Sequence, residues 1–363
     1  MRLFLFFIFI AQFVFAQDSI SDERAITIKP KFGFLAAHRG TMGHLYKDRI
    51  IGTEITFSKR IIASKNWASI YKNPYVGCTF YGSNLGNNDI LGYGFGSYGF
   101  IEFPFINQKK HVVTAKLSAG LGYVTKVFDQ ENNPKNVAVS AHVNALLCLG
   151  LQGRWKITPK HAVIYSFDVT HFSNASTKVP NLGLNMPFIG LGYSYNLSPK
   201  KGPVCSPVKI THTPFFKNWN VHVVGIISKK EVFPTGGKDY PVYAVNTFVS
   251  KRFKEKVGME IGFDFISKQS LFNYKPYIPK TQLSIFQIGT YAAYVLPLDK
   301  LKFVLGMGVY LKDRYDADNE IYHRVGLRYQ CDNGLLLNVV LKSHWAKADY
   351  AEWGIGYTFN YKK

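Results

Sequence analysis

The sequence predicts an all-β protein, an antiparallel transmembrane β-barrel in which an eight-strand unit is duplicated. Apolar and polar residues alternate with period two along most of the 363-residue chain, as in strands that have one face in an apolar medium. Aromatic residues make up 16% of the chain, and membrane barrels carry such residues on their outer face. The first residues also predict export. A soluble secreted β-sandwich shows similar alternation and is the less favoured alternative.

Residues 1–16 predict a secretory signal peptide that is cleaved before Gln17. One Arg precedes an apolar stretch, and Val14 and Ala16 supply the small residues of a cleavage site. The stretch is shorter than the ~20 residues that a membrane-spanning helix requires, and Gln17 in place of Cys argues against a lipoprotein. We therefore expect a protein that is exported to the outer membrane of a Gram-negative-type bacterium.

The formal net charge of +21 indicates an anionic partner or an anionic environment. Export makes membrane lipids the expected partner and excludes nucleic acid. Four Cys are too few for a disulfide-dense scaffold. Cys205 and Cys331 could pair in an oxidising compartment, whereas Cys78 and Cys148 are expected to stay free.

The first barrel unit, residues 17–197, contains eight alternating segments. Within 161–173 the odd-numbered positions from Val163 to Val169 are apolar, and the even-numbered positions Ser166 and Asp168 are polar. Such alternation predicts a strand with one buried or lipid-facing side. The eight expected strands lie near 25–36, 49–60, 72–82, 91–105, 111–127, 136–156, 161–173 and 186–197.

The second unit, residues 219–363, repeats this arrangement. Its eight expected strands lie near 219–229, 240–253, 256–267, 281–297, 300–312, 319–330, 334–344 and 350–361. An even number of strands in each half, joined by connections that tend to alternate short and long, is typical of single-chain bacterial barrels. The connections 61–71 and 268–280 depart from the rule because they are long where short turns are expected.

Matching sequence fragments support a duplication. Gly190-Leu-Gly-Tyr193 in the first unit corresponds to Gly354-Ile-Gly-Tyr357 in the second. Between the units, residues 198–218 are rich in Pro and Lys and predict a linker. Its length favours two eight-stranded barrels, and one sixteen-stranded barrel remains the alternative.

The most informative segment for chemistry is Thr170-His-Phe-Ser-Asn-Ala175. By the alternation, His171 and Ser173 project from the lipid face of a strand that ends at the outer surface. Two residues apart on a strand, their Cβ atoms lie roughly 6–7 Å apart, close enough for the imidazole to take the hydroxyl proton. Polar groups are costly in lipid. The alternative is a polar pair at the strand end that is hydrogen-bonded to loop backbone.

Together with Pro180-Asn-Leu-Gly-Leu-Asn185 and the Gly-Leu-Gly-Tyr strand after it, this segment resembles the PagL-type lipid A 3-O-deacylase and acyloxyacyl hydrolase family, most clearly over 165–197. The resemblance implies an outer-membrane barrel that hydrolyses an acyl ester of lipid A, with lipid A or lipopolysaccharide as its partner. It implies that His171 is the general base and Ser173 the nucleophile, and that Asn174 and Asn181 form the oxyanion site. It implies no metal and no organic cofactor.

The chain departs from the family pattern at the acid that orients the histidine. That residue would lie twelve positions after the serine, where this chain has Asn185. An amide oxygen can accept a hydrogen bond from an imidazole, but it carries no charge to stabilise imidazolium, and this exchange costs about 10⁴ in turnover in serine proteases. The site is therefore expected to turn over slowly, to use another group in place of the acid, or to be inactive. The last case leaves a non-catalytic barrel with a structural or transport role.

The second unit contains only a degenerate copy of this motif. Ala346 and Lys347 occupy the positions of the serine and the asparagine after His344, so the second unit is expected to be non-catalytic. His344 and Glu352 are predicted to form a buried polar pair in the barrel interior. In the first unit, His38 lies in an outer loop without the Cys or clustered carboxylates of a metal site.

Overall fold

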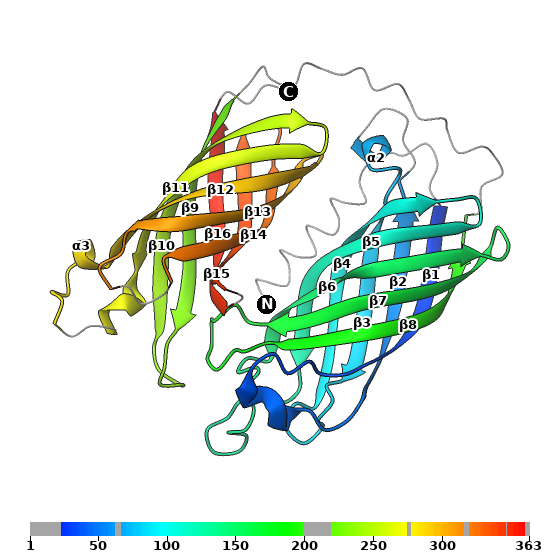
Figure 1. Ribbon diagram of the computed structural model, residues 1–363, viewed down its shortest axis with the longest axis horizontal. Coiled ribbons are helices and arrows are strands. Elements are labelled where there is room, and N and C mark those ends of the chain that lie inside the picture. Colours follow the sequence, from blue (N-terminus) through cyan, green and yellow to red (C-terminus); the bar gives the residue numbers. More distant parts are fainter. Residues whose placement is uncertain are drawn as a thin grey trace. The chain divides into compact units, whose positions relative to one another are not determined.

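The computed structural model describes residues 23–61, 67–198, 219–273, 277–315, 319–345 and 347–359. In this part of the chain, sixteen antiparallel strands form two closed barrels, β1–β8 and β9–β16 (Figure 1). The all-β prediction is confirmed, and the duplicated unit makes two eight-stranded barrels. The expected signal peptide and all of the expected linker except Ser198 lie outside the described residues. Within the described ranges, no helix is long and apolar enough to cross a membrane.

The first barrel closes when its first strand pairs with its last, for example at Lys31 and Gly190. Its strands are β1 (Glu23–Gly33), β2 (Ile50–Arg60), β3 (Tyr75–Asn84), β4 (Tyr93–Asn107), β5 (His111–Val124), β6 (Val143–Lys156), β7 (His161–Ser173) and β8 (Leu184–Asn196). Two short helices lie in its connections, the 3₁₀ helix η1 (Gly40–Leu45) and α2 (Trp67–Ile70). Helix α2 occupies the long connection that departs from the short-turn rule.

The expected strand over 136–156 was wrong at its start, because β6 begins only at Val143. The reason is Asn136, which is fully buried in the preceding loop. Its side-chain nitrogen donates to the carbonyls of Ile90 and Lys126, and its side-chain oxygen accepts from Val139 N. These bonds satisfy backbone groups that a ladder would otherwise pair, so the segment folds as a loop despite its alternation.

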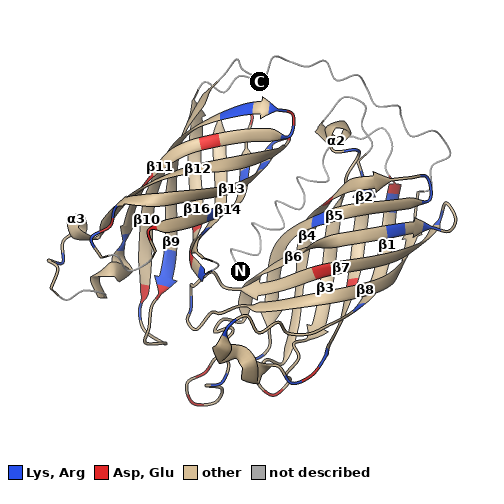
Figure 2. Ribbon diagram, viewed as in Figure 1, with Lys and Arg blue, Asp and Glu red and all other residues tan. Residues whose placement is uncertain are grey.

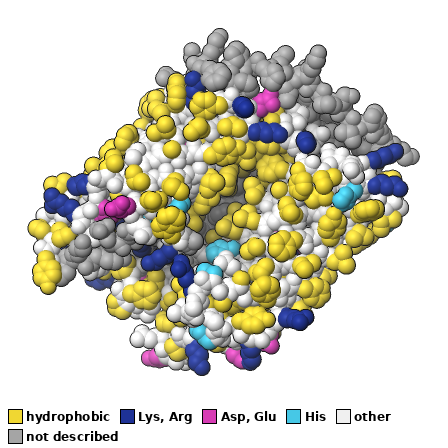
Figure 3. All heavy atoms as spheres, viewed as in Figure 1, with side chains coloured by type: hydrophobic (Ala, Val, Ile, Leu, Met, Phe, Trp, Pro, Cys, Tyr) yellow, Lys and Arg dark blue, Asp and Glu magenta, His cyan; other side chains and the backbone are white. Residues whose placement is uncertain are grey.

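The outer face of the first barrel is apolar. Ile28, Phe80 and Ile189 point outward and are 52%, 54% and 68% exposed. Hydrophobic side chains cover much of the molecular face in Figure 3, and charged residues colour only short stretches of the strands in Figure 2. A closed sheet with an apolar exterior suits a hydrocarbon environment.

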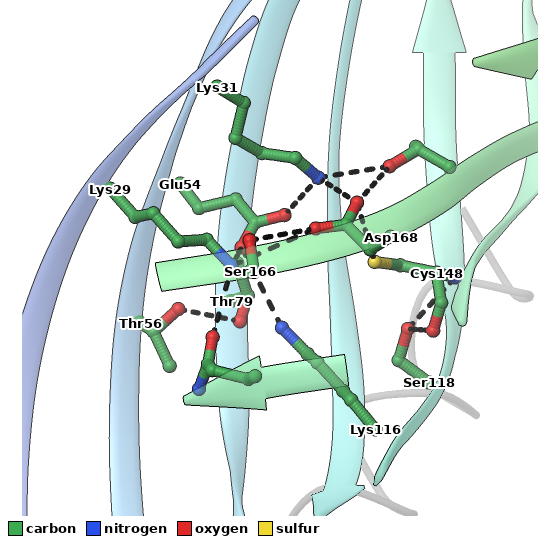
Figure 4. A network of polar contacts seen from close by, with 12 residues as sticks. Lys29, Lys31, Glu54, Thr56, Thr79, Lys116, Ser118, Cys148, Ser166 and Asp168 are labelled. Atoms are coloured by element: carbon green, nitrogen blue, oxygen red, sulfur yellow. Dashed lines mark hydrogen bonds and ion pairs between the residues drawn. The ribbon is translucent and has the colours of Figure 1, made fainter. Parts of the chain in front are cut away.

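The interior of the first barrel is filled by an ionic network (Figure 4). Lys31 is fully buried, and its Nζ lies 2.7 Å from a Glu54 oxygen and 2.5 Å from an Asp168 oxygen. Lys29 and Lys116 lie 2.9 and 3.6 Å from Glu54. Buried charges are tolerated when they are paired. These paired side chains are buried and fill the lumen where they lie.

The second barrel has the same plan. Its strands are β9 (Asn220–Glu231), β10 (Asp239–Lys254), β11 (Val257–Lys268), β12 (Phe286–Leu298), β13 (Leu301–Lys312), β14 (Ile321–Gln330), β15 (Leu335–His344) and β16 (Lys347–Phe359). The short helices η2 (Gln269–Asn273) and α3 (Gln282–Ile285) lie between β11 and β12. Inside this barrel, Arg324 bonds both oxygens of Asp264 at 2.5 and 2.6 Å and also bonds Glu352.

The predicted pairing of His344 with Glu352 was wrong, although both side chains are buried inside the barrel. Glu352 pairs with Arg324, whereas His344 Nε2 lies 3.5 Å from an Asp349 oxygen. The ladder between β15 and β16 pairs Glu352 with Val340, four residues before His344, and His344 lies opposite Lys347. The two groups therefore lie at different levels of the lumen.

The cysteines of the described residues are unpaired. Cys78, Cys148 and Cys331 carry free thiols. The suggested bond between Cys331 and Cys205 stays a prediction, because Cys205 lies outside the described residues.

Candidate active site

The outward face of β7 carries the histidine and serine of the motif. Thr170 and Phe172 are fully buried and point inward, whereas Phe167 is 58% exposed on the other side. His171 and Ser173 share the parity of Phe167 and are half-buried at the end of the strand. They therefore project from the barrel wall on its apolar exterior side.

Strand pairing brings His171 opposite Asn185 of β8. The Nδ1 of His171 lies 2.6 Å from the amide oxygen of Asn185. Since a carbonyl oxygen only accepts, His171 Nδ1 must carry the proton and donate it. The other ring nitrogen, Nε2, then keeps its lone pair, which is the form that a general base requires.

Gly183 makes room for the imidazole. Its φ of +78° lies in the left-handed region, and a Cβ at this position would lie 2.8 Å from His171 Cε1. Any other residue would therefore combine backbone strain with a clash against the ring. The requirement for glycine here is a property of the site, because the atom that it accommodates belongs to His171.

The loop after β7 brings the two candidate oxyanion residues together. The backbone N–H of Asn174 donates to the side-chain oxygen of Asn181 at 3.1 Å, and Asn174 Nδ2 donates to Ser140 Oγ at 3.4 Å. Ala175 and Ser176 follow with φ of +54° and +61°, which turns the chain sharply after Asn174. Because its oxygen is engaged, the Asn181 side chain keeps its NH₂ group as a donor for an anionic oxygen.

His38 also belongs to this site, although its sequence context did not predict it. The chain beyond β1 continues alongside β8, where Ala36 N donates to Asn185 O at 2.9 Å. Two residues later, His38 Nδ1 lies 3.0 Å from Asn185 Nδ2, and His38 Nε2 lies 3.1 Å from Leu182 O. Only the closure of the barrel, in which β1 pairs with β8, could have indicated that His38 lies near Asn185. A register that pairs Lys31 with Gly190 brings the chain just after β1 to Asn185.

His44, which lies in η1 of the same connection as His38, has an anchoring role. His44 Nε2 donates to Lys135 O at 2.8 Å, which ties two loops together. Among the described residues, the cluster with metal-ligand geometry is Glu54, Cys148 and Asp168 in the lumen. The ammonium of Lys31 already lies between its two carboxylates, so these residues do not suit a cation.

The second barrel does not reproduce the site. His344 points into the lumen, where its Nδ1 donates to Ile321 O at 3.0 Å and it is 4% exposed. That orientation is opposite to the outward orientation of His171. Lys347 stands at the asparagine position of the motif, and Ala346 lies outside the described residues.

Two family models match the chain. Residues 40–196 match the lipid A 3-O-deacylase (PagL) model, and residues 218–361 match the acyloxyacyl hydrolase C-terminal domain model. No curated protein matches the chain significantly.

Several solved structures match as well, each over 93% of this chain and 100% of the other. They include a mutant of Rh. blastica porin at 9% identity and a TM-score of 0.17, a triple mutant of Rhodopseudomonas blastica porin at 9% and 0.18, and the NanC porin at 6% and 0.16. At such TM-scores these likenesses carry no argument.

Proposed function

Because this chain belongs to the lipid A 3-O-deacylase (PagL) and acyloxyacyl hydrolase family, we propose that it is an outer-membrane serine esterase that removes one ester-linked acyl chain from lipid A. Ser173 is the nucleophile, His171 the general base, and Asn185 the residue that orients the base. Asn174 and Asn181 stabilise the oxyanion. The observation that carries the proposal is the 2.6 Å contact between His171 Nδ1 and Asn185 Oδ1, because it leaves Nε2 able to accept a proton.

The reaction takes two displacements. In the first, Ser173 Oγ attacks the ester carbonyl while His171 Nε2 takes the hydroxyl proton. The carbonyl oxygen becomes an anion that accepts from the asparagine amides, and collapse of this intermediate expels the sugar alkoxide, which takes the proton from His171. Water then attacks the acyl-Ser173 ester with His171 again as base, which releases the fatty acid and restores the serine.

The location of the site supports a lipid substrate. The ester bonds of lipid A lie at the boundary between sugar headgroup and acyl chains. His171 and Ser173 sit at the end of β7, on the same outward face as the exposed Phe167. A lipid in the outer leaflet could therefore bring its ester to Ser173 by lateral diffusion, without entering the barrel.

The amide at position 185 favours a second candidate, a non-catalytic barrel with a structural role. A transport role is disfavoured because the lumen of the first barrel is filled around Lys31, Glu54 and Asp168. A structural scaffold predicts no turnover at all, so one assay separates the two candidates.

The test is the mass of lipid A after incubation with the purified protein in mixed detergent micelles. The wild type is expected to produce a species that lacks one acyl chain, and Ser173→Ala is expected to produce none. Ser198→Ala, which removes an exposed hydroxyl after the end of β8, is the matched control and should retain activity. Unchanged lipid A with the wild type, or equal product with Ser173→Ala, would overturn the proposal.

A further inference from the structure

We propose that His38 is a positioning residue of this site, which orients the Asn185 amide and thereby sets the tautomer of His171. The inference rests on the proposed function for its catalytic consequence. The orientation itself follows from hydrogen-bond donors and acceptors alone.

The chain of assignments starts at a carbonyl. Leu182 O, 3.1 Å from His38 Nε2, only accepts, so His38 Nε2 carries a proton and donates it. In a neutral imidazole the other nitrogen then has a lone pair. His38 Nδ1 accepts from Asn185 Nδ2 at 3.0 Å. Ala36 O also lies 3.5 Å from His38 Nδ1, but two acceptors do not bond, and the shorter contact to the amide donor sets the arrangement.

The orientation of the Asn185 amide then determines which ring nitrogen of His171 carries the proton. With Nδ2 of Asn185 turned to His38, the amide oxygen faces His171 Nδ1 at 2.6 Å. His171 is then protonated at Nδ1 and basic at Nε2. Half a turn of the amide would place Nδ2 against His171 Nδ1, which would have to accept. The proton would then move to His171 Nε2, and that nitrogen could no longer take a proton from Ser173.

A carboxylate at position 185 would not need this help. Its two oxygens both accept, so either one holds His171 in the same tautomer. An amide has one acceptor end and one donor end, and something must choose between them. His38 supplies that choice from the opposite side of Asn185.

The position of His38 is fixed by backbone contacts that do not involve its ring. Ala36 N donates to Asn185 O at 2.9 Å, and Phe34 N donates to Pro187 O at 3.4 Å. Removal of the imidazole in His38→Ala therefore leaves the path of this segment in place. The variant is expected to keep the barrel and to lose only the orientation of the amide.

The test is a double-mutant cycle between positions 38 and 185. His38→Ala is expected to lower kcat about fivefold, the scale of one lost hydrogen bond, with little change in KM. In an Asn185→Asp background the same change is expected to lower kcat by at most about twofold, because the carboxylate needs no orientation. His44→Ala is the matched control, since His44 also anchors a loop to a carbonyl but does not touch Asn185. An equal loss in both backgrounds would overturn the proposal and reduce His38 to a loop anchor.

A second readout does not depend on activity. In ¹⁵N-histidine-labelled protein in micelles, the ring nitrogens of His171 report which one carries the proton, and His171→Gln identifies its signals among the 10 histidines. The wild type is expected to show a proton on Nδ1, and His38→Ala a shift toward the Nε2–H form. An unchanged tautomer in His38→Ala overturns the inference. If wild-type protein leaves lipid A intact but its tautomer responds to His38→Ala, the proposed function fails and the positioning role stands.

Discussion

Restoring a carboxylate at position 185 is expected to raise turnover. Asn185→Asp is isosteric, so a carboxylate oxygen would take the place of the amide oxygen 2.6 Å from His171 Nδ1. The tautomer of His171 is already the useful one, and the gain therefore comes only from stabilising the imidazolium that forms in the transition state.

The size of the gain follows from the environment of the pair. Two unit charges about 4 Å apart attract by about 1 kcal/mol in water and by about 4 kcal/mol at the effective dielectric of a protein surface. His171 and Asn185 are both half-buried, so the attraction between the carboxylate and the imidazolium lies between these limits. At about 1.4 kcal/mol per factor of ten, kcat should rise roughly five- to a thousandfold.

The assay is the rate of acyl loss from lipid A under saturating substrate. Asn196→Asp is the matched control, because it adds the same charge to the other end of β8, on the order of 36 Å away at the rise of a strand. Asn185→Glu should also raise turnover, but less, because one extra methylene must fit between the strand and the ring. No gain in either variant, with the barrel intact, would refute the reasoning and mean that another group already supplies the charge.

Three further predictions test the site and the fold. Gly183→Ala should lower kcat about tenfold, because its Cβ would lie 2.8 Å from His171. Gly236→Ala is the control, at a similar φ but with nothing within 4 Å, and should cost only about 1 kcal/mol of stability. Equal activity in both variants would contradict the contact argument. Lys31→Met should lower the free energy of unfolding in detergent by about 3–5 kcal/mol, because Glu54 and Asp168 lose the buried cation between them. Lys47→Met, which breaks the exposed pair with Asp89, is the control and should have no measurable effect. Equal stability of the two variants would contradict the role of the buried Lys31. Unboiled and boiled samples should migrate differently in a detergent gel, as closed barrels resist detergent, and identical mobility would count against the membrane barrel.

Alternation was enough to predict on which side of the sheet the motif lies. The side-chain period of a strand is two, so a register error of one residue would have turned His171 and Ser173 into the lumen. The apolar residues Val163 to Val169 exclude that error, because they need the lipid face. The same reasoning correctly placed His344 inside the second barrel.

Partners across the sheet could not be predicted in this way. His344 and Glu352 share a face, but the pairing of β15 with β16 places Glu352 opposite Val340, four residues before His344. The contact of His38 with Asn185 spans 147 positions in the chain and exists only because β1 closes onto β8. Alternation describes one strand at a time and contains no information on closure. The loop before β6 was mispredicted for a related reason, since the side chain of Asn136 competes with the ladder for backbone partners.

The acid of a serine hydrolase has two separable tasks, to orient the histidine and to stabilise its charge. In this chain the oxygen of Asn185 can do the first only while its amide keeps one orientation, and the neutral amide cannot do the second. The two tasks therefore respond to different mutations. His38→Ala disturbs the orientation of the Asn185 amide and does not change the charge near His171. Asn185→Asp supplies a negative charge beside His171 and makes the orientation of the imidazole independent of His38. If His38 acted independently of position 185, the effects of the two mutations would simply add. The geometry around Asn185 instead requires them to be coupled, with the loss on removing His38 present only while position 185 is an amide.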